Sequence, residues 1–430
     1  MPYKLLAVTG ALLAVCFPLF AQDPPETAPS KDVWSWGHKI EIRADYRWSA
    51  NEKHPVGFPF PTPQFETTPD PGSHVELNVA DLQLDLGYGT WFAARAKGHA
   101  IAKHRRNPTS TDRKSDVDEL WVRIGQNPEF LERPEKTSFF LQAGKFPKME
   151  RQPIRLLESY GLAATSFNRF EDVQVLAGGS VGRNLYWRVQ AANGNPLFMR
   201  DPNALAGDNG TQERKLGTGF PILYNAETED LFLNNDHLQV GEGLGYRWQR
   251  QDETLGFDAI VFHYRRKLAK TQKLSGTFYG GDLDLLLVDE VPGVDPVGLP
   301  TTGNQKDEYG ARVYAEWHAA TLIAQYTKQD VAGLQREGWE LETGYSFPLH
   351  LGPVESIQPA FRISNLDNHF TSPPRFPAPS LRWDWQKLDG GVRIGLGHGL
   401  DVTAEYTQHH VYSRRKLNLR EALVTVRWRV

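Results

Sequence analysis

The sequence predicts an all-β protein, a transmembrane antiparallel β-barrel of 16 strands, with 18 strands as the alternative. Three observations predict this fold class. Apolar and polar residues alternate over long segments, aromatic residues stand at both ends of the apolar faces, and long and short connections alternate between segments. The mean hydropathy of −0.49 excludes a bundle of transmembrane helices. It fits a barrel, because only one face of each barrel strand is apolar.

The segment 34–48 shows the alternation most completely. Its even positions are apolar or aromatic apart from one histidine, and its odd positions are mostly polar or charged. Between the aromatic ends the segment spans ~33 Å at ~3.3 Å per residue. Tilted by ~40°, it covers the height of about 25 Å that the apolar band of an outer-membrane barrel has, whereas strands of soluble sandwiches usually run ~5–6 residues. The aromatic girdle is predicted to include Trp34, Trp36, Tyr46, Trp48 and, near the end of the chain, Trp428.

The first residues predict export from the cytoplasm. Residues 1–21 resemble a cleaved signal peptide, with Lys4 before an apolar run that is shorter than the ~20 residues of a membrane-spanning helix. Residues 22–32 predict a polar periplasmic linker, and residues 33–430 the barrel. The expected location is the bacterial outer membrane. If the chain is cut after Ala21, the mature protein loses Cys16, which is its only cysteine.

Fifteen further segments repeat the alternation in order along the chain. The last one ends at Val430, with Val424, Val426 and Trp428 predicted to face outward. The predicted strands after the first are 75–88, 92–102, 119–124, 139–143, 173–177, 184–191, 238–248, 255–261, 309–317, 322–326, 339–347, 357–363, 383–396, 400–406 and 422–430.

The connections support the same fold without reference to hydrophobicity. Long outer loops and short periplasmic turns should alternate around a barrel, and the connections 50–73, 89–90, 147–170, 180–183 and 193–235 alternate in this way. If 267–306 is one outer loop, the alternation continues to the end of the chain, which gives 16 strands and places both termini in the periplasm. If 277–288 is counted as a wall strand, the alternative is a barrel of 18 strands.

Composition and motifs give no support for catalysis, metal binding or nucleic-acid binding. The 48 basic and 52 acidic residues are nearly balanced, so nucleic acid is not an expected partner. Residues 178–182 match Gly-x-Ser-x-Gly, but an alternating segment follows, where a hydrolase nucleophile elbow requires a helix. A hairpin is therefore the better interpretation of Ser180. The sequence predicts no catalytic residue, no metal site and no cofactor.

One connection has an unusual composition. The segment 145–170 is basic, mildly apolar and long enough to fold back into the lumen, where it would narrow the pore and set its selectivity. The alternative is a surface loop exposed outside the barrel. The predicted constriction residues are Lys145, Lys148, Arg151, Arg155 and Arg169, against only Glu150 and Glu158.

The lumen face of the early strands is also expected to be positive. Its basic residues are offset in part by Glu41, Asp45 and Glu119, and a net positive charge in a confined pore favours anions. The predicted basic residues of this face are Arg43, Arg95, Lys97, Lys103, Arg123 and Arg188.

Over residues 143–195 the chain resembles the phosphate-selective outer-membrane porins. The motifs that carry the resemblance are Ala143–Pro147 (AGKFP), Arg169–Val175 (RFEDVQV), Gly182–Trp187 (GRNLYW) and Ala192–Gly194 (ANG). This resemblance implies the smaller strand count, a homotrimer and a pore that passes anions. A second, more general resemblance, to alginate-export barrels, implies the larger strand count and a basic lumen.

These observations lead to one expected function and several alternatives. The expected function is an outer-membrane porin that forms a water-filled, anion-preferring diffusion channel for small solutes. The alternatives are an exporter of an anionic polysaccharide, an outer-membrane hydrolase and a secreted glycan-binding β-protein. The expected partners are outer-membrane lipid, small anionic solutes, the barrel assembly machinery and, in a homotrimer, two further copies of the chain.

Overall fold

The structure is a computed structural model that describes most of the chain after residue 32. The described residues are 33–51, 54–56, 65–67, 72–100, 115–127, 137–152, 154–167, 171–193, 222–224, 237–250, 252, 254–267, 275–278, 281–284, 305–331, 333–370, 384–412 and 416–430. The predicted signal peptide (1–21) and linker (22–32) lie outside these ranges, so both stay predictions.

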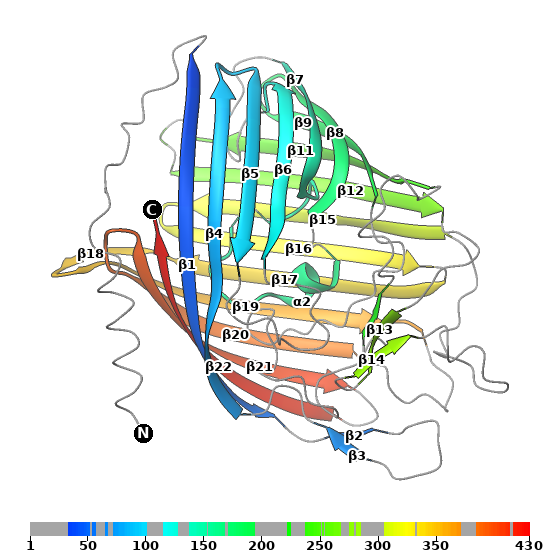
Figure 1. The fold of residues 1–430 in the computed structure, drawn as a ribbon, viewed down its shortest axis with the longest axis vertical. Helices are drawn as coiled ribbons and strands as arrows, with labels where there is room; N and C mark the ends of the chain where they lie inside the picture. Colours follow the sequence, from blue (N-terminus) through cyan, green and yellow to red (C-terminus); the bar gives the residue numbers. More distant parts are fainter. Residues whose placement is uncertain are drawn as a thin grey trace.

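Most of the described strands form one closed antiparallel barrel, whose sheet we call the wall (Figure 1). Each wall strand pairs with its neighbours in the chain, and β1 closes the ring by pairing with both β4 and β22. The wall strands are β1 (Trp34–Asn51), β4 (Gly72–Tyr88), β5 (Phe92–Ala100), β6 (Ser115–Gly125), β7 (Ser138–Pro147), β8 (Glu171–Val181), β9 (Leu185–Ala192), β11 (Gln239–Gln249), β12 (Leu255–Lys267), β15 (Gln305–Trp317), β16 (Ala320–Val331), β17 (Leu334–Tyr345), β18 (Phe347–Leu351), β19 (Val354–Asn368), β20 (Asp384–Gly395), β21 (Leu400–Tyr412) and β22 (Lys416–Arg429).

The wall has 16 strands, because β17 and β18 both pair with β19 and act as one strand interrupted at Ser346. The predicted count of 16 is confirmed. Residues 275–278 (β13) and 281–284 (β14) pair with each other, and β13 also pairs with β10 (Ile222–Tyr224). The described part of 277–288 therefore supplies no wall strand. Because β12 pairs directly with β15 in the closed barrel, the alternative of 18 strands is wrong.

Long and short connections collect at opposite ends of the barrel, which we call the loop end and the turn end. The turn end has short connections such as 182–184 and 352–353. The loop end has long ones such as 52–71, with the hairpin of β2 (His54–Val56) and β3 (Phe65–Thr67). Two connections at the loop end, 332–333 and 413–415, are short. The expectation that outer loops stay long to the end of the chain is wrong at these two places.

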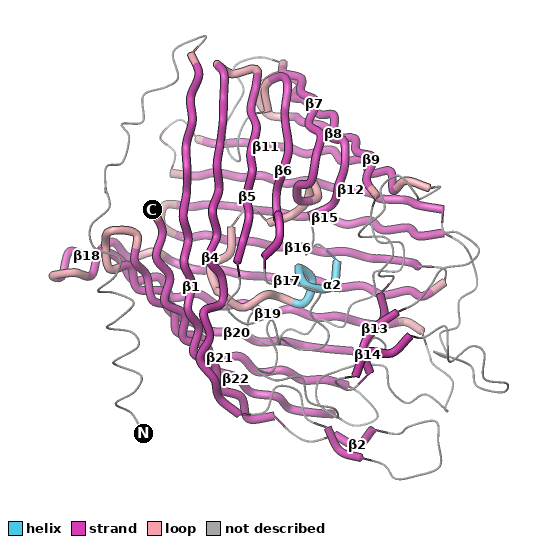
Figure 2. The backbone as a smooth tube through the Cα atoms, in the orientation of Figure 1, coloured by secondary structure: helices cyan, strands magenta, loops and turns pink. Residues whose placement is uncertain are grey.

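Strands make up the wall, as Figure 2 shows, and the exposure of their side chains reverses the usual pattern of a soluble protein. Large apolar side chains are exposed on the outward face, including Trp36 at 77% and Leu120 at 58%. Inward-facing positions carry buried polar and charged side chains, such as Arg362 and Glu342. Period-2 alternation produces this arrangement, because successive residues of a strand point to opposite faces. An apolar outer surface of this extent is typical of a barrel that contacts lipid.

No described helix is long and apolar enough to cross a bilayer. The helix that the structure describes, α2 (Leu162–Phe167), belongs to the connection between β7 and β8, and it contacts β16, β17, β19 and β20. The described part of this connection folds into the barrel and forms part of the candidate functional site.

Candidate functional site

The described part of the connection after β7 lies inside the lumen rather than outside the barrel. We call these residues, 148–152 and 154–167, the inner loop. Its apolar side chains pack against inward-facing apolar residues of the wall: Leu156 and Leu157 contact Tyr314, Ile323 and Ala360. Burial of apolar surface inside a mostly polar lumen holds the loop against β15, β16 and β19.

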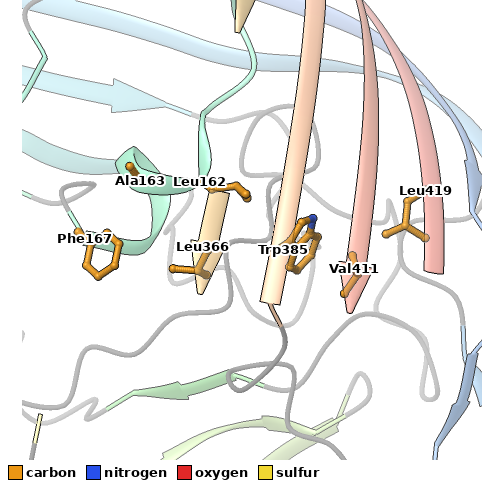
Figure 3. Close-up of a cluster of buried hydrophobic side chains, with 7 residues drawn as sticks. All are labelled: Leu162, Ala163, Phe167, Leu366, Trp385, Val411 and Leu419. Carbon is orange, nitrogen blue, oxygen red and sulfur yellow. The ribbon is translucent and has the colours of Figure 1, made fainter. Parts of the chain in front are cut away.

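The second half of the inner loop is anchored by a larger apolar cluster (Figure 3). Here Trp385, which is fully buried, stands at the centre of an inward-facing apolar surface. The cluster joins α2 to β19, β20, β21 and β22, and its members are Leu162, Ala163, Phe167, Leu366, Trp385, Val411 and Leu419. The inner loop is therefore packed against one side of the barrel wall.

Charged side chains of the wall bind the main chain of the inner loop. The Glu342 carboxylate accepts hydrogen bonds from the backbone amides of Leu156 at 2.6 Å and Leu157 at 3.1 Å. In the opposite sense, Arg362 donates to the Ser159 carbonyl at 2.9 Å and Lys387 to the Tyr160 carbonyl at 2.6 Å. These bonds satisfy buried backbone groups that have no partner in a strand or helix.

Glu158 at the tip of the loop reaches a cluster of guanidinium groups from three strands. We call Arg43 of β1, Arg393 of β20 and Arg427 of β22 the arginine triad. Their nitrogen atoms lie 3.5, 2.8 and 2.8 Å from the Glu158 carboxylate. Burial alone raises the pKa of this carboxyl, but the arginine triad outweighs burial and lowers the pKa to about 2. Glu158 is therefore ionised at neutral pH.

Ion pairs also hold the start of the inner loop. Lys148 pairs with Glu308 at 3.0 Å, and its ammonium lies 4.8 Å from the centre of the Tyr264 ring. Burial lowers the pKa of Lys148, but Glu308 outweighs it and raises the pKa above its usual value. Arg151 pairs with Glu171 at the start of β8. Two of the three loop cations are thus neutralised by carboxylates.

Arg155 differs from these two cations. Its guanidinium lies 3.9 Å from the centre of the Tyr160 ring and donates a hydrogen bond to the Glu158 carbonyl at 3.0 Å. Within the described ranges it has no carboxylate within ion-pair distance. Arg155 therefore carries a positive charge that no described ion pair neutralises, and the Glu158 carboxylate acts on this charge only from beyond ion-pair distance.

A cavity of about 380 Å³ remains between the inner loop and the wall. We call this space the opening. Its walls combine cations, amides, an aromatic ring and an aliphatic side chain. They are formed by Glu119, Pro147, Lys148, Arg151, Gln152, Ile154, Arg155, Tyr160, Ala164 and Gln325.

Beside Glu119, strands β5 and β6 add a row of basic and aromatic side chains. The guanidinium groups of Arg95 and Arg123 each lie 5.5 Å from the centre of the Trp121 ring. Arg95 is also paired with Asp85 at 2.7 Å. Lys97 is held between Asp81 at 3.1 Å and Asp118 at 3.0 Å. Much of the positive charge on this part of the wall is thus matched by carboxylates.

The structure brings together some of the predicted constriction residues and separates others. Lys148, Arg151 and Arg155 line the opening. Lys145 is paired across the ladders with Leu120 and Val173, which are exposed on the outward face, so its predicted place in the pore is wrong. Arg169 lies outside the described residues, as does Lys103 of the predicted lumen face.

The remaining predicted lumen residues point inward from the wall. Arg43 belongs to the arginine triad, where it pairs with Glu158, and it is not among the residues that line the opening. Arg188 donates a hydrogen bond to the Asn127 side chain at 3.0 Å and lies against the rings of Phe140 and Tyr186. Of the predicted girdle residues, Trp34, Trp36, Tyr46 and Trp48 are exposed and Trp428 is half-exposed, all outward.

The positive balance was expected for the early strands, and over all the described wall strands the excess of positive charge is small. Among their buried residues, 11 are Lys or Arg and nine are Asp or Glu, and the inner loop adds the buried Glu150 and Glu158. The sequence interpretation missed the acidic residues of the last strands, chiefly Glu308, Glu340, Glu342, Asp389 and Glu405. A signal for them was present: Glu340 and Glu342 flank outward-facing Leu341, so alternation places both inside.

Ser180 occupies an inward-facing position in β8. Its hydroxyl is 2.6 Å from the Ser138 hydroxyl, and its oxygen accepts a hydrogen bond from the Ser138 amide. A second serine cannot act as the general base that a serine nucleophile requires. The residues after it form a turn and strand β9, as predicted, and not a helix.

Comparisons with known proteins match the fold of this chain. No family model and no curated protein sequence matches it. A structure of OprB from Pseudomonas putida matches with a TM-score of 0.52 at 9% identity, over 92% of this chain and 94% of that one. The anion-selective porin from Comamonas acidovorans matches with a TM-score of 0.52 at 8% identity, over 93% and 100%. The trimer form of OmpT from Vibrio cholerae gives 0.50 at 11% identity, over 93% and 100%. The chain has the 16-strand barrel fold of these outer-membrane proteins.

Proposed function

We propose that this protein is an outer-membrane porin that forms a water-filled, anion-preferring diffusion channel for small solutes. The observation that carries the proposal is the inner loop, which folds into the lumen and leaves an opening of about 380 Å³ with charged walls. A barrel whose apolar face is outward and whose lumen is polar and narrowed by a loop can pass small solutes across a membrane.

The anion preference rests on the charges around the opening and not on the whole lumen. Three cations and one carboxylate line the opening, and Arg155 has no carboxylate partner in the described structure. A fixed, uncompensated charge in a narrow water-filled passage attracts ions of opposite sign more strongly than the same charge does on an open surface. The fold likeness to an anion-selective porin agrees with this preference.

The proposal extends to small anions as a class and not to phosphate in particular. The resemblance to phosphate-selective porins rests on residues 143–195, where two of the cations lining the opening, Lys148 and Arg151, are neutralised by Glu308 and Glu171. Export of an anionic polysaccharide fits less well, because the anchored inner loop leaves a small opening. We further propose that outer-membrane lipid and the barrel assembly machinery are partners of the barrel.

The experiment that tests the proposal is single-channel recording in a planar bilayer under a potassium chloride gradient. We expect discrete conductance with a reversal potential of the anion-selective sign. Arg155→Gln should move the permeability ratio of chloride to potassium towards one, because it removes the uncompensated charge. Arg250→Gln, at an exposed turn-end arginine, is the matched control and should change nothing.

Two results would contradict the proposal. Cation selectivity of the wild-type channel would keep the barrel but overturn the charge argument. Absence of conductance from folded, heat-modifiable protein would overturn the channel itself.

A further inference from the structure

The opening contains an exposed aliphatic side chain that ion conduction alone does not require. Ile154 is 40% exposed, whereas the neighbouring loop residues Leu156 and Leu157 are 3% and 1% exposed against the wall. An aliphatic side chain that is exposed to water lacks the favourable free energy that burial of its apolar surface would provide. An apolar part of a solute that contacts Ile154 would recover that free energy.

Ile154 lies next to the uncompensated cation in the walls of the opening. Arg155 follows it in the chain, and the Arg155 guanidinium lies over the Tyr160 ring at 3.9 Å. The ring fixes the plane of the guanidinium, and a fixed guanidinium binds a carboxylate through two parallel hydrogen bonds. One N–H is used by the Glu158 carbonyl, which leaves others to bind a solute.

The remaining walls suit a small organic molecule. The side chains of Gln152 and Gln325 offer amide donors and acceptors, and Tyr160 offers part of a ring. A volume of about 380 Å³ lies within the range of small-molecule sites, which typically combine apolar walls with a few polar groups that fix orientation. An inorganic anion would bind the Arg155 guanidinium but would make no favourable contact with the apolar walls of the opening.

We propose that the opening is a binding site for small organic monocarboxylates with an apolar body, in which Arg155 binds the carboxylate and Ile154 contacts the apolar part. The inference rests on the proposed channel function and deepens it, because it names the class of solute. Arg155 sets the charge of the solute, and Ile154 discriminates between carboxylates of different apolar size.

The test compares benzoate with acetate in a planar bilayer at fixed potassium chloride. We expect benzoate to reduce the chloride current in a saturable way and at lower concentration than acetate. Ile154→Ser should weaken the benzoate effect roughly tenfold, because an apolar contact is lost. The same variant should weaken the acetate effect much less, because acetate offers only a methyl group to residue 154. Arg155→Gln should remove both effects.

Two control variants separate loss of the contact from disturbance of the loop. Ile154→Val keeps an aliphatic side chain and should behave like the wild type. Arg250→Gln, at the exposed turn end and outside the opening, should also leave benzoate block intact.

The possible failures are distinguishable. If the channel is anion-selective but benzoate and acetate act alike, or if Ile154→Ser does not alter the benzoate effect, this inference is wrong and the proposed function stands. If folded protein shows no conductance or cation selectivity, the proposed function fails and this inference fails with it.

Discussion

At the scale of single residues, Glu158 and Arg155 show how position in the inner loop decides the role of a charge. Both are polar residues of one short segment. Glu158 is 2% exposed at its side chain and is bound by three guanidinium groups, so its charge is used internally. Arg155 has no carboxylate partner in the described structure and lines the opening, so its charge remains for solutes. Sequence alone does not distinguish these roles, because the partners lie on strands far along the chain.

Replacing Glu158 by glutamine is expected to destabilise the barrel by about 3 kcal/mol, because it removes the carboxylate from a buried arginine cluster. The free energy of unfolding in urea, measured for protein refolded into lipid vesicles, tests this value. Asp252→Asn at an exposed turn is the control and should change the stability little. Wild-type stability in Glu158→Gln would show that the ion pairs do not hold the loop.

Titration of Glu158 should make a defined contribution to the pH dependence of the free energy of unfolding. Its pKa is lowered from 4.5 to about 2, so the ionised form stabilises the fold fully above pH 4.5. This contribution is lost as the pH falls through about 2. The stability difference between wild type and Glu158→Gln should therefore be constant from pH 7 to about pH 5 and then shrink on acidification. A difference that grows as the pH falls contradicts the assignment.

At the scale of elements, the wall strands were predictable and the course of the inner loop only in part. Alternation places Trp34 and Trp36 outward without knowledge of any neighbour, since it depends only on the period of a strand. Lys145 was misplaced because the sequence does not show where the strand ends and the loop begins. The packing of Leu157 against Tyr314 was not predictable, because it joins residues distant in the chain.

The anchoring of the inner loop leads to a prediction about pore size. Leu157→Ala should weaken the apolar contact with Tyr314 and Ile323, at a cost of about 3 kcal/mol for a buried leucine. A less firmly held loop should widen the opening and raise the single-channel conductance and its noise. Leu322→Ala on the outward face is the matched control and should leave conductance unchanged. Equal conductance in both variants would mean that other anchors suffice.

At the scale of the whole molecule, the two sides of the barrel differ in a way that bears on assembly. Strands β5 to β9 have 8 to 11 residues, whereas β21 and β22 have 13 and 14. Over β1 and β4 to β7 the outward face has a hollow of about 460 Å³, with Ala94, Ala96 and Ala143 among the residues that line it. Small residues on a membrane-facing surface allow another chain to approach closely. We propose that this hollow is a contact surface between copies of the chain in a homotrimer.

This contact surface can be tested with two alanines that have similar positions on opposite sides of the barrel. Ala96→Leu would fill the hollow, whereas Ala311→Leu adds the same bulk to the outward face of β15. We expect wild type and Ala311→Leu to sediment as trimers in detergent and Ala96→Leu to sediment as a monomer that still conducts. Monomeric wild type would remove the basis for a trimer. Trimers in all three proteins would show that the contact surface lies elsewhere. Two barrels that pack closely at Ala96 would have no space for a leucine side chain at this position.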